Sequence, residues 1–291
     1  MLSLHTNAAA LSAQNSITRT QSSLSTSQTR LSTGFRINSA MDDAAGLQIA
    51  TRLKAQTSGM SIAMRNTQNS ISMMQTAEGA LDESTNILVR MKDLATQAAD
   101  ASSNSTDKNA MQAEFDSLTS ELNNIMTNTK FGGTTLLTDG SGKFSAAIDF
   151  QIGSDSSEKM NMDLSTQMTN MHADIKLAAG GYDGATGVAV TTAGTEMTST
   201  ANATIKLLAT AIDTVGTLRS ALGANSNRLD HVYNNLSNIS TNTKAAAGRI
   251  MDTDFAMESS NMTQSQMLLQ AGTAMLKQSN STSSLVMSLL Q

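Results

Sequence analysis

Histidines and paired acids are the residues of this chain that could perform acid–base catalysis or bind a metal, but their spacing supports neither. His5, His172 and His231 are far apart, and none has a second histidine or a carboxylate at the spacing of a helical zinc site such as H-E-x-x-H. The acid pairs Asp42-Asp43 and Asp82-Glu83 are adjacent in sequence, and neighbours on a helix do not face each other. We therefore predict solvated or helix-capping roles for these acids and no metal site.

Other kinds of site are also missing from the sequence. The chain has no Cys, which excludes disulfide frameworks, thiol catalysis and cysteine-ligated metals. The glycines at 132–133 and 180–181 lack the neighbours that a phosphate-binding loop needs. The 19 Lys and Arg are scattered without aromatic stacking partners, and no apolar run approaches the roughly 18 residues of a membrane span. We expect no enzyme, no cofactor, no nucleic-acid partner and no membrane insertion.

The composition favours long helices instead. The 291 residues include no Pro, where average usage would give about 15. Proline interrupts helices, so its absence permits long uninterrupted ones. Aromatic residues make up only 3% of the chain, and a thin core of small and aliphatic side chains suits paired helices.

Three segments carry apolar residues at alternating spacings of three and four, the pattern of packed helices. They lie at 57–100, 108–128 and 202–243, and each stripe has at most one polar member, such as Ser84 or Asn225. The first and third would form rods of about 60–65 Å at 1.5 Å per residue. The sequence therefore predicts a mainly α fold, a long antiparallel coiled coil or helical bundle.

A short β signal interrupts the helices. Apolar and polar residues alternate at 144–152 and again at 160–164, with a Gly/Ser/Asp turn between them, which predicts a hairpin at about 140–165. The Gly- and Thr-rich segment 178–203 is interpreted as a short exposed loop with one short strand at Val188–Val190.

Both ends of the chain are poor in charge. Residues 1–41 contain three Arg and no acidic residue, and Lys277 is the one charged residue in 259–291. Sparse apolar stripes bury too little surface for such helices to fold alone, because ordering the backbone costs about 1–2 kcal/mol per residue. Disordered tails are one interpretation. The other is that the terminal helices pair and then pack against further copies through Leu4, Leu11, Ile17, Leu24, Leu31, Met262, Leu269, Leu276, Leu285 and Leu289.

Two long motifs resemble the signatures of bacterial flagellins. LSTGFRINSAMDDAAGLQIATRL at 31–53 is similar to their N-terminal signature, and GRIMDTDFAMESSNMTQSQMLLQAGTAMLKQSN at 248–280 to their C-terminal one. Both stand in the right order at opposite ends of the chain. The short middle and the high Met content resemble a minimal, lateral-type flagellin.

The resemblance implies a hairpin-shaped subunit of the extracellular flagellar filament. Residues 1–40 and 256–291 would form an inner helical pair, 41–177 and 204–255 an outer rod domain, and 178–203 a loop replacing variable surface domains. It further implies a homopolymer that serves motility and type III export without a cleaved signal peptide. The implied partners are an export chaperone on the C-terminal helix and filament cap and junction proteins.

The resemblance also implies a secondary role in innate immunity. A rod-domain patch recognised by a vertebrate Toll-like receptor matches here at Arg90, Leu94 and Glu114. The alternative is that these residues make contacts within the filament, because Leu94 also lies on the helix stripe. A hook–filament junction protein is the alternative function, although the C-terminal signature argues against it.

Overall fold

The computed structural model describes residues 7–185 and 194–289, the last seven of these as backbone only. The chain forms two compact units, one of residues 1–57 with 241–291 and the other of residues 58–240. The predicted fold class is confirmed: helices dominate, and the two small sheets have two antiparallel strands each. The prediction of an inner pair, a rod domain and a loop with the bounds given above stays a prediction.

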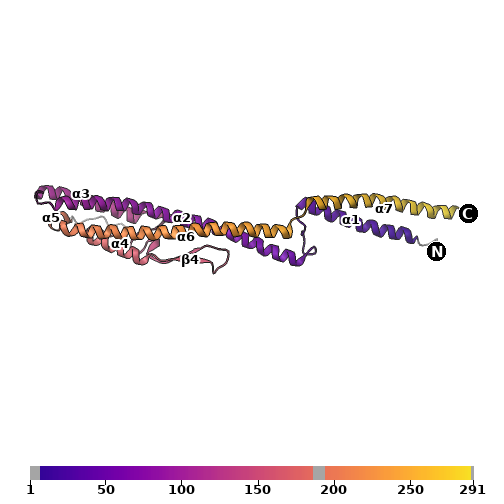
Figure 1. Cartoon of the computed structure of the whole chain (residues 1–291), viewed down its shortest axis with the longest axis horizontal. Helices are drawn as coiled ribbons and strands as arrows, with labels where there is room; N and C mark the ends of the chain where they lie inside the picture. Colours follow the sequence, from indigo (N-terminus) through magenta and orange to yellow (C-terminus); the bar gives the residue numbers. More distant parts are fainter. Residues whose placement is uncertain (1–6, 186–193, 290–291) are drawn as a thin grey trace. The chain divides into compact units, whose positions relative to one another are not determined.

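Three helices supply most of the core of the 58–240 unit: α2 (Ala44–Ala98), α3 (Ser105–Asn128) and α6 (Ala201–Met251). Asp82 on α2 pairs with Arg219 on α6, and Arg90 on α2 pairs with Glu114 on α3. Met60 on α2 packs in one cluster with Leu236 on α6, so α2 and α6 run antiparallel here (Figure 1). The stripe predicted on α2 is buried throughout, from Met74 to Ala98.

Local sequence signals explain where these helices begin. Asn104 caps α3 through a capping box: its Oδ1 accepts from the Asp107 backbone N–H at 2.8 Å, and the Asp107 carboxylate accepts from the Asn104 N–H. Asp43 accepts from the Gly46 N–H at 2.8 Å at the start of α2. Asp42 accepts from the backbone of Ser39 and then of Asn38, and these bonds lower the pKa of its carboxyl. The predicted capping role is confirmed for Asp43, whereas Asp42 binds the backbone of the turn before α2.

The predicted hairpin forms from β3 (Ile148–Gln151) and β4 (Lys159–Met162), with Ile148 opposite Met162. The sequence missed a smaller hairpin, β1 (Lys130–Phe131) with β2 (Thr134–Thr135). Its turn residues Gly132 and Gly133 both have positive φ. The preceding helix α3 already ends at Asn128, before these glycines. The sequence also missed the helix α4 (Ser165–Ala178), which follows β4.

The segment 178–203 differs from the expected exposed loop. Tyr182 and Met197 are buried in the core, and a short helix α5 (Glu196–Ser199) precedes α6. Side chains of α3 hold both flanks: Asn123 Oδ1 accepts from the Gly184 N–H at 3.0 Å, and Gln112 Oε1 accepts from the Met197 N–H at 2.7 Å. The strand suggested at Val188–Val190 lies outside the described residues.

A buried histidine joins three parts of the 58–240 unit. His172 on α4 contacts the Tyr182 hydroxyl through Nδ1 at 2.7 Å and the Leu137 carbonyl through Nε2 at 2.8 Å. Because a carbonyl only accepts, Nε2 carries the proton, and the Tyr182 hydroxyl donates to Nδ1. Burial lowers the pKa of His172 and raises that of Tyr182. His172 is therefore a neutral structural residue.

We predict that acid weakens this unit through His172. The folded-state pKa lies below the ordinary value of 6.5, so below that pH the unfolded chain binds a proton that the folded chain excludes. The free energy of unfolding should therefore be constant above pH 6.5 and fall as the pH drops below it. Urea denaturation between pH 7.5 and 5 should show a shallower decline in His172→Gln. The exposed His231→Gln is the control, and equal declines in all three proteins would contradict the prediction.

Candidate functional site

The helices α1 (Ala8–Thr33) and α7 (Phe255–Leu289) form an antiparallel pair in the unit of residues 1–57 and 241–291 (Figure 1). Asn7 Nδ2 donates to the Ser279 carbonyl at 3.3 Å near one end of the pair. A Cβ on Gly272 would lie 2.9 Å from Cγ1 of Ile17, so the absence of a side chain at 272 permits close approach there. Arg30 approaches Glu258 near the other end. The start of α1 thus lies beside the later part of α7, and the end of α1 lies beside the start of α7.

Backbone hydrogen bonds fix the end of the pair where α6 passes into α7. Gly34 caps α1 in the left-handed region with φ of 76°, and its N–H donates to the Arg30 carbonyl. The Gly34 carbonyl then accepts from the Thr253 N–H at 3.0 Å, and the Arg36 N–H donates to the Met251 carbonyl at 2.6 Å. The Arg36 guanidinium adds a bond to the Ile250 carbonyl at 3.0 Å. Segments more than 200 residues apart are therefore locked in register.

The inward face of the pair consists of partly covered residues together with the buried Ser27 and Glu258. Along α7 they follow alternating steps of four and three: Glu258, Met262, Ser265, Leu269, Gly272, Leu276 and Ser279. The matching positions of α1 are Asn7, Ala10, Ala13, Ile17, Thr20, Leu24, Ser27 and Leu31. Six of the predicted packing residues, three from each helix, thus lie at these inward positions.

The other predicted packing residues are placed differently. Leu11 is exposed and lies away from the inward positions of α1. Leu4 lies outside the described residues, and Leu285 and Leu289 are described as backbone only. Their part in packing stays a prediction.

The pair leaves apolar surface uncovered. Among the described side chains of α1 and α7, the fully buried ones are polar, Ser27 and Glu258. Charges on these described side chains are few: Arg19 and Arg30 on α1, Glu258 and Lys277 on α7. Large apolar side chains are exposed instead, namely Leu11, Phe255, Met257, Met267, Leu268 and Met275. A surface of this kind is typical of an interface rather than of a solvated helix pair.

The exposed apolar positions of α7 are not among the packing residues predicted from the sequence. Met257, Leu268 and Met275 are separated by 11 and 7 residues, which places them within about 20° of one another around a helix. This spacing was available in the sequence. It was hidden because Met262, Leu269 and Leu276 form a second stripe beside it, and only the position of α1 decides which stripe faces inward.

One ion pair lies within the seam between α1 and α7. Arg30 Nη1 is 3.7 Å from Glu258 Oε2, and the Glu258 residue is only 7% exposed. Arg30 Nε is buried without a hydrogen-bond partner. Since the distance is long and one donor is unpaired, this contact fixes register more than it adds stability.

The residues of the predicted receptor patch are only partly brought together on the surface. Arg90 Nη2 and Nε donate to Glu114 Oε1 at 2.6 and 3.0 Å, and both side chains are about half exposed. Leu94 is only 2% exposed because it packs in the core between the helices. The buried position of Leu94 therefore does not fit an exposed receptor patch, whereas Val89 on the same helix is exposed.

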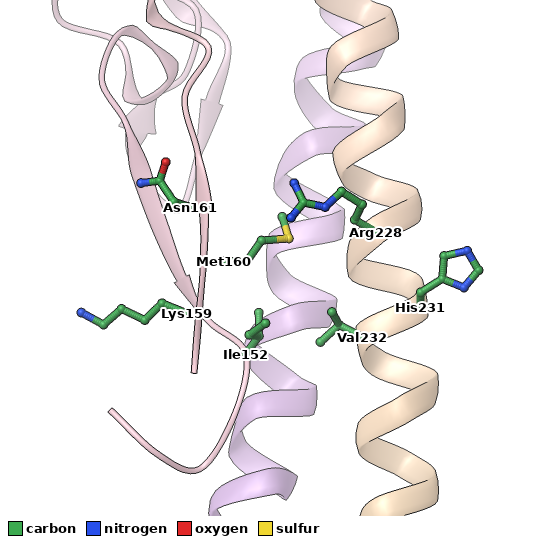
Figure 2. A pocket seen from close by; sticks show the side chains of 7 residues that line it. All are labelled: Ile152, Lys159, Met160, Asn161, Arg228, His231 and Val232. Carbon is green, nitrogen blue, oxygen red and sulfur yellow. The ribbon is translucent and has the colours of Figure 1, made fainter. Parts of the chain in front are cut away.

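A hollow of about 440 Å³ lies between the β3–β4 hairpin and α6. Lys159, Arg228 and His231 carry the side-chain nitrogens that could bind an anion here, but Figure 2 shows that they do not converge on one point. Lys159 and His231 point in opposite directions, and Arg228 reaches toward the hairpin. Ile152, Met160 and Val232 supply an apolar lining. The arrangement does not form a site for an anion.

Within residues 7–185 and 194–289, no cluster of three or more His, Asp or Glu could hold a metal ion. None of the helices in that part of the chain combines the length and apolar character needed to cross a membrane. The α1–α7 pair is therefore the candidate site on structural grounds.

Comparison with known proteins finds two matches, which include α1 and α7. The N-terminal helical region of bacterial flagellin matches residues 4–141, and the C-terminal helical region of bacterial flagellin matches residues 205–290. The chain is 34% identical to Flagellin A of Vibrio anguillarum over 381 aligned positions covering all of both proteins. It is 32% identical to Polar flagellin F of Vibrio parahaemolyticus, with 99% of each chain covered.

The alignment with Flagellin A has 381 positions and this chain 291 residues, so at least 90 positions have no counterpart here. A solved flagellar hook-associated protein from Vibrio parahaemolyticus has a similar fold, with a TM-score of 0.56 at 14% identity over 72% of this chain and all of that one. The two family matches and the full-length relatives lead to one conclusion. This chain belongs to the bacterial flagellins, structural subunits of the flagellar filament.

Proposed function

We propose that this chain polymerises through its α1–α7 pair into an extracellular helical filament that serves motility. Many copies would enclose the pair, so that the apolar side chains it leaves exposed are buried between subunits. A contact between different patches on neighbouring copies extends without closing and produces an open helix. Motility would then follow from rotation of a long, stiff assembly rather than from any chemistry in one chain.

The observation that carries this proposal is the absence of a fully buried apolar side chain in the described part of the pair. Two helices in water gain stability mainly by burying apolar surface, at about 25 cal/mol per Å². In the described part of α1 and α7 the fully buried side chains are Ser27 and Glu258, while Met257, Leu268 and Met275 face outward. Contact with further copies supplies the burial that a single chain lacks.

The same uncovered surface supports the remaining partners of the proposal. Before assembly, α7 needs protection from premature aggregation, which an export chaperone bound to this helix would give. Export by the type III route without a cleaved signal peptide, and contacts with filament cap and junction proteins, complete the proposal. A junction protein remains the alternative within the same class, distinguished by whether the purified chain forms long filaments by itself.

A second proposed function is recognition by a vertebrate Toll-like receptor. Arg90 and Glu114 support it because they form an exposed ion pair on adjacent helices of the 58–240 unit. Arg90 retains donors for charge-assisted hydrogen bonds to a receptor. Val89 takes the place of buried Leu94 as the exposed apolar neighbour in this proposal.

We predict that α1 and α7 are the least protected helices of the unassembled protein. In dilute solution their amide hydrogens should exchange about 100-fold faster than those of α2 and α6 within residues 58–240, because little apolar burial holds them. Hydrogen exchange followed by mass spectrometry measures this, and filaments should show protection at the same peptides. Full protection of both terminal helices in the monomer would sink the proposal that they depend on neighbours.

We predict that polar substitution on the outward face of α7 blocks assembly. The double variant Leu268→Ser with Met275→Ser should raise the concentration needed for polymerisation about tenfold or more, since each change removes roughly 1–2 kcal/mol of apolar burial per contact. Sedimentation followed by electron microscopy measures the effect. Leu177→Ser is the matched control, because Leu177 is 66% exposed but lies on α4. Unchanged filaments from the double variant would refute this role for α7.

We predict that Arg90→Ala lowers receptor signalling about tenfold while leaving the fold intact, because exposed ion pairs contribute little to stability. A cell reporter for the receptor, with the protein supplied as monomer, measures the response. Arg219→Ala is the control, since Arg219 forms a comparable pair with Asp82 on another surface. Undiminished signalling by Arg90→Ala would contradict a role for Arg90 in receptor recognition.

A further inference from the structure

The solvent exposure of the methionines differs between the two units of the chain. Twelve of the 20 lie within residues 58–240, and none of these is exposed: ten are buried and Met64 and Met73 are partly buried. Among the methionines whose side chains the structure describes, the exposed ones are Met41, Met257, Met267 and Met275, and all lie in the unit of residues 1–57 and 241–291. Exposed thioethers are thus confined to the unit that holds the α1–α7 pair.

Exposure decides which methionines react with two-electron oxidants. Hydrogen peroxide transfers one oxygen atom: the sulfur lone pair attacks a peroxide oxygen, the O–O bond breaks, and water leaves after proton transfer. The thioether is oxidised to a sulfoxide as the peroxide is reduced, so no further reactant is needed. A buried sulfur is shielded from this attack, whereas the three methionines of α7 named above are 60–67% exposed.

We propose that Met257, Met267 and Met275 form an oxidation-sensitive site, and that their conversion to sulfoxides by a peroxide prevents a subunit from joining the filament. This inference rests on the proposed assembly through α1 and α7. Met257 and Met275 lie on the same side of α7 as Leu268, and Met267 lies on a different side. Oxidation therefore places polar S–O groups on more than one face of α7.

The chemistry of the sulfoxide explains why assembly would stop. A thioether is a flexible apolar group that adapts to irregular contacts, and its oxidation makes it polar and chiral. The sulfoxide oxygen needs a hydrogen-bond donor when it leaves water. The exposed side chains near these positions on α7 are mostly neutral, with Gln266, Gln270 and Gln278 as amide donors and Lys277 as the one cation among the described side chains that far along the helix. A sulfoxide oxygen must therefore find a donor in a contact otherwise filled by an apolar thioether. In the assembled filament the same sulfurs would be covered and protected.

The test treats unassembled protein with hydrogen peroxide, removes the oxidant, and measures polymerisation by sedimentation and electron microscopy. Peptide mass spectrometry locates each added oxygen atom. The triple variant Met257→Leu, Met267→Leu, Met275→Leu keeps apolar side chains of similar volume that the oxidant does not attack. Met41→Leu is the matched control, because Met41 is 97% exposed in the same unit but lies outside both α1 and α7.

We expect oxidation to raise the polymerisation concentration of the parent protein and of Met41→Leu about tenfold, and that of the triple variant less than about twofold. We also expect sulfoxides at the three α7 positions in monomers and far fewer in treated filaments. Equal loss in the triple variant, or unimpaired assembly of oxidised parent protein, overturns the inference. Failure of the untreated protein to polymerise would instead overturn the proposed function, so the two failures are distinguishable.

Discussion

Two helices alone offer too little apolar burial, and this constraint governs the α1–α7 pair. A helix in a pair can hide only the side chains that face its partner, and here that seam alternates small, polar and aliphatic residues such as Ser27, Thr20 and Leu24. Polar caps and cross-links hold the register, including the Asn7–Ser279 bond and the Gly34–Thr253 bond. Hydrogen bonds within one chain thus fix the register of the pair. Its stability would come from the proposed contacts with other copies.

The 58–240 unit shows the opposite balance. Its helices α2, α3 and α6 share one large core with the hairpin and α4, and leucines such as Leu81, Leu122 and Leu218 have almost no exposed surface. Most buried polar groups inside it are paired, as in the His172–Tyr182 and Gln112–Met197 contacts, while the Thr138 hydroxyl is buried without a hydrogen-bond partner. Such a unit can hold its shape by itself, because burial and most of its hydrogen bonding are completed within one chain. The α1–α7 pair differs, because large apolar side chains stay exposed on it in the single chain.

Methionine has different consequences in these two environments. In the core its flexible side chain fills the irregular space between helices and a small hairpin, as Met160, Met162 and Met168 do. On α7 the same side chain is exposed, and its adaptability suits a contact between many copies. The exposed position also makes it reactive, so in the assembly proposed above the same residue is the point where an oxidant would act.

The sequence by itself determined the helical class, the paired stripes of α2 and α6, the β3–β4 hairpin and the capping acids, because each depends on spacing within a short stretch of chain. It also determined the family, through two long motifs at opposite ends. Only the tertiary structure decided that Leu94 is buried while Arg90 meets Glu114, that Tyr182 is buried rather than in an exposed loop, and which of two neighbouring α7 stripes faces α1. The physical reason is that these outcomes depend on side chains brought together from distant segments. Local spacing shows which residues share a face of a helix, but it does not show which other segment will pack against that face.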